Sequence, residues 1–388
     1  MKDARTFVGW DSVPTGSDRV GSETQPTLAA AAGCVRKEID VTTRSVQCLP
    51  YSVHRIGRLG FLMVIGSMFA YVPAAGQHRP GDTELPDAKP VPALQVIPLP
   101  HDQASFRLGL AELTRYHFGP SLRRPFLYPL LGPEGRSLTH MVQPSDPHGH
   151  RHHTSLWISH ADVQGVGFWN DETEGRIVTL QVEQYLDDGQ AGPGASMLVT
   201  NAWRDAQDRT LLVERRRITV VPGDGADATE SWTMLIDLEL AAPDDQPVTL
   251  GETAFGIIGV RMAKSIGVHE GGGRILNSEG QRNEDEMFRK PARWVDYSGP
   301  VTNASTGGIT LMDHPANPHH PAPFHVRDEG WMGACLTFDG SITIEPAAPL
   351  RLRYGLWMHA RVPDRQTIDA VWSEFSRLPL SALVVDRD

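Results

Sequence analysis

Residues 176–185 read RIVTLQVEQY, a run in which two sets of side chains alternate along the chain. Successive side chains of a β-strand point to opposite faces, so each set would occupy one face of a strand. One face would carry Ile177, Thr179, Gln181 and Glu183, and the other Val178, Leu180, Val182 and Gln184. The run is therefore predicted to form a strand.

Further runs of this kind follow, rich in Val, Ile, Leu, Thr and Trp and bounded by Gly, Pro, Asn or Asp. They are Ser196–Trp203, Thr210–Val221, Glu230–Leu240, Val248–Val260, Gly308–Met312, Trp331–Phe338, Ser341–Glu345 and Leu350–His359. Many short strands with almost no helix between them predict an all-β fold, a large antiparallel sandwich. The counts of 37 Gly and 30 Pro agree with a chain that turns often.

One helix is predicted, at the C-terminus, where Pro363 and Asp364 provide a start signal. The apolar residues that follow at helical spacing are Ile368, Val371, Trp372 and Phe375. They form one stripe, which is expected to pack on the outside of a sheet.

The first hundred residues carry targeting signals. Arg55 and Arg58 precede an apolar run and small residues, the order of a secretory signal peptide, expected over 53–76. The alternative is an uncut anchor, although the run is shorter than the roughly 20 residues of a membrane span. Residues 1–52 are expected to be disordered or a mis-assigned upstream segment, 77–104 a proline-rich linker, and 105–388 one sandwich domain. The expected location is secreted or periplasmic.

The formal net charge of -11 excludes a nucleic-acid partner, because phosphate binding favours a basic face. A small-molecule or glycan substrate is expected instead. The motifs G-x-S-x-G and H-E-x-x-H are absent from the sequence, so serine-hydrolase and zincin chemistry lack support.

Histidines gather in two windows, Asp146–Asp162 and Asp313–Arg327. In the first window His148, His150 and His152 alternate and would share a face of an extended chain, while Arg151 and His153 would point the other way. Two imidazoles so placed can bind a metal or a substrate.

Later in the first window His160 and Asp162 are two residues apart, so Asp162 could fix the tautomer of His160. Trp169 follows, and it could flank a sugar ring or pack in the core.

In the second window prolines are expected to keep the chain extended and its side chains preorganised. The polar candidates there are Asp313, His314, His325 and Arg327, while Asn317 could cap a turn. Tyr297, in the nearby run RWVDYSG of residues 293–299, is a further candidate. The alternative is that these histidines are exposed to solvent and have no functional role, as is common for single surface histidines.

Four segments resemble a bacterial family of unknown function that is often labelled PmoA-like, after methane oxygenase. They are FLYPLLGPEGRSLTH (126–140), HGHRHHTSLWISHADVQGVGFW (148–169), RWVDYSGP (293–300) and DHPANPHHPAPFHVR (313–327). The resemblance spans Phe126 to His359. It implies a β-sandwich of the galactose-mutarotase-like kind in an exported protein. Family members more often show D-H-P-H-H-R where this chain has G-H-R-H-H-T.

Three functions remain open. The leading one is a carbohydrate-active enzyme (hydrolase, lyase or epimerase) in which His152 or His160 acts as general acid or base and His325 and Arg327 hold substrate oxygens. Its expected substrate-binding residues are Arg151, His153, Trp169, Asn317 and Tyr297. The second is a metal-dependent, oxygenase-like enzyme with a divalent ion on His150, His152, Asp313 and His314. The third is a non-catalytic glycan-binding protein.

Overall fold

The computed structural model describes residues 90–141, 151–190, 193–223, 231–380 and 382–385. The chain divides into two units, residues 1–83 and 84–388, and every described residue belongs to the second. The expected signal peptide, the segment before it, and His148 and His150 therefore lie outside the described residues. None of the helices among the described residues has the length and the apolar composition of a membrane span.

The larger sheet has nine strands in the order β1, β2, β3, β4, β5, β11, β17, β16, β13, and all neighbouring pairs are antiparallel. Their bounds are β1 Leu94–Leu99, β2 Gln103–Leu108, β3 Ala111–His117, β4 Phe126–Leu130, β5 Leu156–His160, β11 Gly256–Arg261, β17 Trp331–Cys335, β16 Pro323–Arg327 and β13 Lys290–Pro291.

The second sheet has eight antiparallel strands in the order β12, β14, β15, β19, β9, β8, β7, β6. Their bounds are β12 Arg274–Asn277, β14 Trp294–Pro300, β15 Thr306–Asp313, β19 Leu350–Ala360, β9 Trp232–Ala241, β8 Thr210–Pro222, β7 Ala195–Arg204 and β6 Arg176–Leu186. A two-stranded sheet pairs β10 (Val248–Leu250) with β18 (Ile342–Ile344).

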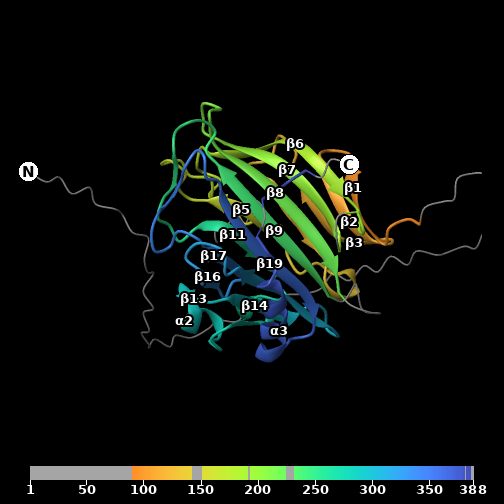
Figure 1. Cartoon of the computed structure of the whole chain (residues 1–388). Coiled ribbons are helices and arrows are strands. Elements are labelled where there is room, and N and C mark those ends of the chain that lie inside the picture. Colours follow the sequence, from red (N-terminus) through yellow and green to blue (C-terminus); the bar gives the residue numbers. More distant parts are fainter. Residues whose placement is uncertain (1–89, 142–150, 191–192, 224–230, 381, 386–388) are drawn as a thin grey trace, which may run out of the picture. The chain divides into compact units, whose positions relative to one another are not determined.

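The core lies between the two large sheets, which Figure 1 shows layered against each other. One cluster of buried apolar side chains joins both sheets, for example Phe106 and Ile258 of the first with Ile236 and Leu356 of the second. The Trp232 indole nitrogen also donates to the Leu131 carbonyl at 2.7 Å. The predicted all-β antiparallel sandwich is confirmed.

Several strand boundaries differ from prediction for local reasons. The pairing of β6 with β7 shifts register twice, after Thr179 and after Val182, so the simple alternation of 176–185 does not persist. The predicted strand Val248–Val260 divides into β10 and β11. The predicted linker 77–104 contains β1 and the first residues of β2, and Pro98 is tolerated in β1 because β1 is an edge strand.

The C-terminal helix is confirmed as α3 (Arg365–Phe375), and the Asp364 side chain caps it by accepting from the Thr367 backbone N–H at 2.8 Å. Its apolar stripe packs on the outer face of the eight-stranded sheet, against Leu276, Trp294 and Met312. Two short helices, α1 (Val268–Gly271) and α2 (Asn283–Met287), and the 3-10 turn η1 (Pro133–Gly135) lie in connections.

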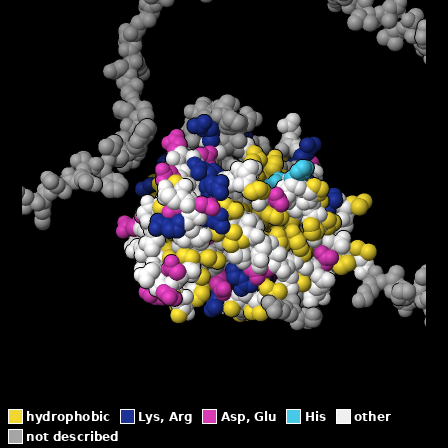
Figure 2. Space-filling model, turned by 90° about the horizontal axis from the view of Figure 1, so that it is seen from above, with side chains coloured by type: hydrophobic (Ala, Val, Ile, Leu, Met, Phe, Trp, Pro, Cys, Tyr) yellow, Lys and Arg dark blue, Asp and Glu magenta, His cyan; other side chains and the backbone are white. Residues whose placement is uncertain are grey.

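Seen from above, acidic and basic side chains are interspersed over one part of the surface, while hydrophobic side chains gather over another (Figure 2). The net charge of -11 is therefore not spread as a uniform acidic field over this side of the molecule.

Candidate functional site

A row of four residues crosses the outer face of the nine-stranded sheet. Trp157 of β5 pairs with Gly259 of β11, Gly259 with Gly333 of β17, and Gly333 with His325 of β16. Because the two glycines have no side chains, neighbouring indole rings can lie directly on the sheet backbone. A Cβ at Gly259 would lie 2.5 Å from Cζ2 of Trp157, so the indole ring rests directly on the glycine backbone.

Around this row lies a tryptophan cluster, defined by Phe126, Trp157, Trp169 and Trp331, all buried. Strand pairing places Trp331 beside Arg261 on one side and beside Arg327 on the other. The cluster therefore combines large rings with cationic side chains on one sheet face.

The structure brings one residue from each histidine window to this cluster. His153 stacks on Trp157, with ring centroids 5.1 Å apart, and lies 5.0 Å from the Trp331 ring. His325 lies 4.5 Å from the same Trp331 ring. Segments more than 150 positions apart in the chain thus meet at one indole.

The His325 imidazole is surrounded by Trp331, Phe255 and Phe288. Burial, together with the charges of Arg327 and Arg289, lowers the pKa of His325 to about 3. A neutral imidazole can accept one hydrogen bond and donate one. His325 is therefore suited to holding a hydroxyl group, and less suited than an imidazolium to stabilising negative charge.

Arg327 is anchored by an ion pair with Glu284 of α2, and its guanidinium lies 4.7 Å from the Phe288 ring centroid. The backbone N–H of Asp328 donates to the other oxygen of Glu284 at 3.0 Å. Glu284 was not among the sequence candidates, because the acidic run in which it lies looks like an ordinary solvated loop.

A small hollow opens beside the cluster, and we call it the histidine pocket. It has a volume of about 140 Å³ and is lined by Arg151, His152, Asn170, Asp171 and Glu172. The ring of His152 contacts the ring of His153 edge-on, with centroids 4.3 Å apart. The pocket is thus joined to the tryptophan cluster by two successive histidines.

Arg124, which precedes β4, holds the two walls of this pocket together. Its guanidinium is 4% exposed and donates to the carbonyl of Trp169 at 2.8 Å and to that of His152 at 3.4 Å. It also forms an ion pair with Asp171 at 3.3 Å. Burial lowers the pKa of Arg124 to about 10, so the group stays charged at neutral pH. The sequence offers no local signal for this role.

His160 does not belong to the pocket. It is fully buried, its Nδ1 accepts from the Asp162 backbone N–H at 3.1 Å, and its Nε2 lies 2.9 Å from the Thr337 hydroxyl oxygen. Burial lowers the pKa of His160 to about 4. Both ring nitrogens of His160 are thus engaged in hydrogen bonds within the protein. This geometry does not agree with the expected acid–base role of His160.

The Asp162 carboxylate likewise does not orient the His160 ring as expected. It accepts from the Gly165 backbone N–H at 2.8 Å and so closes the turn that follows β5.

Asp313 and His314 form a separate cluster on the second sheet. The buried Asp313 carboxylate accepts from Asn317 at 2.8 Å, from His320 at 2.8 Å and from the Ala322 backbone at 3.0 Å. His314 is satisfied by the Ala316 N–H and the Leu378 carbonyl. These bonds stabilise the proline-rich loop, which explains its polar composition without a substrate.

Asn317 and Tyr297 also make structural bonds. Asn317 donates to the Arg353 carbonyl and accepts from the Arg353 N–H, both at 2.8 Å. The buried Tyr297 hydroxyl donates to the Asp328 carbonyl at 3.0 Å, and burial raises the pKa of that hydroxyl. Neither residue lines the histidine pocket.

The predicted metal ligands are not assembled in the described part of the chain. His150 lies outside it, His152 lines the histidine pocket, and Asp313 and His314 belong to the loop cluster. Among the residues that the structure describes, no group of three His, Cys, Asp or Glu side chains is placed to hold a metal ion.

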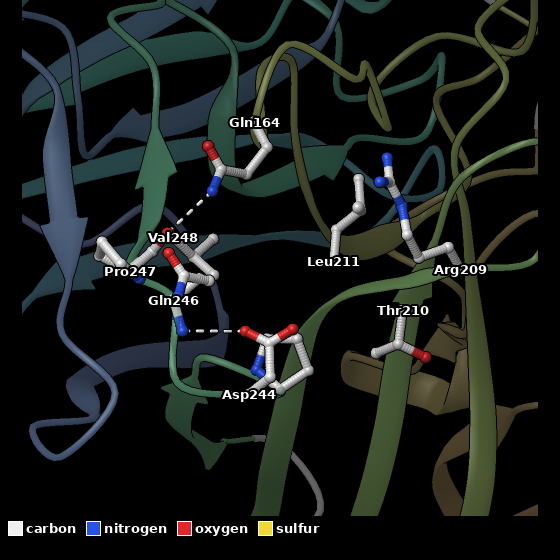
Figure 3. A pocket seen from close by; sticks show the side chains of 9 residues that line it. Gln164, Arg209, Thr210, Leu211, Asp244, Gln246, Pro247 and Val248 are labelled. Atoms are coloured by element: carbon white, nitrogen blue, oxygen red, sulfur yellow. Dashed lines mark hydrogen bonds between the residues drawn. The ribbon is translucent and has the colours of Figure 1, made fainter.

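A second hollow of about 270 Å³ lies between the β8 and β10 ends, where Gln164 faces Leu211 and Arg209 across the opening (Figure 3). The Gln164 amide donates to the Pro247 carbonyl at 2.9 Å, and the Gln246 N–H donates to Asp244 at 2.9 Å. This hollow contains no histidine.

No curated protein matches the sequence. The solved structures that are similar include two of a heparinase III gene product, one with methylated lysines, at 11% and 12% identity and a TM-score of 0.31. Each match covers 71% of this chain but only 37% of the heparinase chain. A family model matches residues 103–373. The chain therefore belongs to the family described as "Family of unknown function (DUF6807)".

Proposed function

We propose that this protein is a carbohydrate-active enzyme whose sugar-binding site is the histidine pocket. The observation that carries the proposal is the joint lining of one hollow by the His152 imidazole, the Asp171 and Glu172 carboxylates, and the Arg151 and Asn170 side chains. Imidazole, carboxylate, guanidinium and amide together supply the acid–base groups and the hydrogen bonds that sugar chemistry needs.

The size and surroundings of the pocket favour a small polar ligand. Its volume of about 140 Å³ lies below the roughly 300 Å³ at which sites for drug-sized ligands begin. A single sugar residue is a ligand of suitable size. Phe255, 36% exposed and 6.0 Å from the Trp169 ring, offers an apolar surface for an adjoining residue of the glycan.

In this proposal His152 acts as the general acid or base, because it is the histidine that lines the hollow. Asp171 is fixed by Arg124 and would hold sugar hydroxyls. Glu172 is exposed at the rim and would supply the carboxylate that works with His152 in a hydrolytic mechanism. Arg124 is a positioning residue, since it acts through Asp171 and the carbonyls it binds.

The test is turnover of a glycan panel by the purified protein and by two variants, His152→Ala and Glu172→Gln. The matched control is His269→Ala, an exposed histidine outside the pocket. We expect turnover of at least one glycan, a loss of about 100-fold or more in His152→Ala, and no change in the control. Equal turnover by His152→Ala would overturn the site, and saturable binding without turnover would establish a glycan-binding protein instead.

The metal-dependent alternative is tested on the same protein, purified without a histidine tag, by elemental analysis before and after dialysis against a chelator. A stoichiometric metal whose removal abolishes turnover would favour that alternative. Turnover that is unaffected by the chelator would favour the acid–base proposal.

A further inference from the structure

Two buried indole N–H groups in the tryptophan cluster make no hydrogen bond within the described structure, those of Trp157 and Trp169. The two residues are only 1% and 3% exposed. Four other indoles of this protein make hydrogen bonds. The Trp203 indole donates to the Glu214 carboxylate at 2.7 Å, and the Trp232 indole donates to the Leu131 carbonyl at 2.7 Å. The Trp294 indole donates to the Asp369 carboxylate at 2.9 Å, and the Trp372 indole donates to the Asp313 carbonyl at 3.1 Å.

An unpaired buried N–H destabilises the folded state, and folded proteins rarely retain one without a reason. Here two occur with ring centroids 5.3 Å apart, beside the proposed sugar site. An indole N–H can only donate. The missing partner must therefore be an acceptor, and an oxygen of a ligand meets that requirement.

A third unpaired atom lies on the same face. Nδ1 of His325 is buried without a hydrogen-bond partner in the described structure. Burial keeps the His325 ring neutral, and one nitrogen of a neutral imidazole accepts a hydrogen bond, so Nδ1 can accept from a ligand hydroxyl. The cluster offers a ligand two donors and one acceptor.

The two indoles favour a carboxylate as the acceptor. An ionised carboxylate has two oxygens that only accept hydrogen bonds, which matches two N–H groups that only donate. The guanidinium groups on this face are paired within the protein, Arg124 with Asp171 and Arg327 with Glu284, so the indoles themselves must provide the hydrogen bonds to the acid.

We infer that the tryptophan cluster recognises a sugar acid, with the carboxylate accepting from the Trp157 and Trp169 indoles and a neighbouring hydroxyl donating to His325. The inference rests on the proposed function and names its substrate class as glycans that contain uronic acid. Phe255, the exposed ring between Trp169 and His325, marks the side from which the acid enters.

The first experiment compares oligomers of galacturonate, glucuronate and mannuronate with their methyl esters, which keep the sugar and remove the charge. We expect at least one acid to bind 10-fold or more tightly than its ester, in calorimetric titrations. In ¹⁵N-labelled protein the indole N–H resonance of Trp169, assigned by its loss in Trp169→Phe, should shift with the acid and not with the ester.

The second experiment replaces Trp169 by benzothienylalanine, which has nearly the same shape and lacks the N–H. We expect the preference for the acid to fall about 10-fold while the melting temperature stays equal or rises, because an unpaired N–H is removed. The same replacement at Trp372 is the control. It should lower the melting temperature through loss of the bond to Asp313 and leave the preference unchanged.

Equal affinity for acid and ester, or an unchanged preference after the Trp169 replacement, would overturn the inference. If neutral glycans are nevertheless turned over in a His152-dependent way, the proposed function stands and only the sugar-acid assignment fails. If no glycan of either charge is bound, both fail.

Discussion

The imidazole of His153 lies almost parallel to the indole of Trp157, with their planes 18° apart and their centroids separated by 5.1 Å. Trp157 in turn lies on the bare backbone of Gly259. Sheet, indole and imidazole are therefore stacked as three layers, and His152, the next residue along the chain, lines the pocket. The position of His152 in the pocket therefore depends on how closely the Trp157 indole lies on the Gly259 backbone.

Adding a methyl group under Trp157 tests this dependence. In Gly259→Ala the new Cβ would lie 2.5 Å from the indole, so the ring must move. Overpacking of this kind lowers the free energy of unfolding by about 2 kcal/mol. We expect that loss in urea denaturation, together with a changed tryptophan near-ultraviolet dichroism. Gly119→Ala, where the nearest atom is 3.9 Å away, should change neither, and an unaltered Gly259→Ala spectrum would contradict the layered arrangement.

Arg124→Gln should weaken both the fold and the pocket. The substitution removes a buried charge that binds the carbonyls of Trp169 and His152 and the Asp171 carboxylate. Loss of such a network costs about 3 kcal/mol in unfolding free energy. Urea denaturation measures it, with the exposed Arg136→Gln as the matched control. Turnover should fall mainly through kcat, and equal stability of the two variants would refute the anchoring role.

The buried, neutral His160 predicts acid sensitivity. Its pKa falls from 6.5 to about 4 on folding, so between these values the unfolded chain binds a proton that the folded chain does not. The free energy of unfolding must therefore decrease as the pH falls through this window, by about 2.5 kcal/mol at about pH 4.5 from this one group.

His160→Gln isolates this effect, because the glutamine amide can still donate to Thr337 and does not titrate. Urea denaturation at about pH 7 and about pH 4.5 should show a smaller loss of stability in the variant than in the natural protein. Identical losses in the two proteins would mean that His160 is protonated in the folded state.

Asp313→Ala separates a structural from a metal-binding role. The carboxylate accepts from Asn317, His320 and the Ala322 backbone, so its loss leaves three donors without a partner. We expect the unfolding free energy to fall by about 3 kcal/mol, with no change in metal content by elemental analysis. The exposed Asp339→Ala should have no effect on either. Loss of a stoichiometric metal from the Asp313 variant alone would restore the metal hypothesis.

The strands of the second sheet could be predicted from sequence because their patterns are local. The runs behind β7, β8, β9 and β19 are long and bounded by turn residues, and α3 begins at its expected cap, Asp364. The leading hypothesis from sequence drew its catalytic residues from both histidine windows, and the structure places His153 and His325 against the same Trp331 ring.

The internal arrangement of the site depends on register, which no local pattern encodes. His160 is hydrogen-bonded to Thr337, 177 positions away in the chain. The nearness of Asp162 in the sequence therefore led to the wrong side-chain partner for His160. Gly259 and Gly333 matter only because strand pairing places them between Trp157 and His325. Arg124 stands in an unremarkable run, and its partners are visible only in three dimensions.

The cross-strand row through Trp157, Gly259, Gly333 and His325 has a consequence for the order in which the protein folds. Each member comes from a different strand, so the row exists only after the hairpin of β16 and β17 and two non-local pairings, β5 with β11 and β11 with β17, have formed. The non-local pairings carry a large loop-closure cost and form slowly. A chain still emerging during synthesis can hold no ligand there until residue 333 is available, and ligand binding would then selectively stabilise the last-assembled part of the sheet.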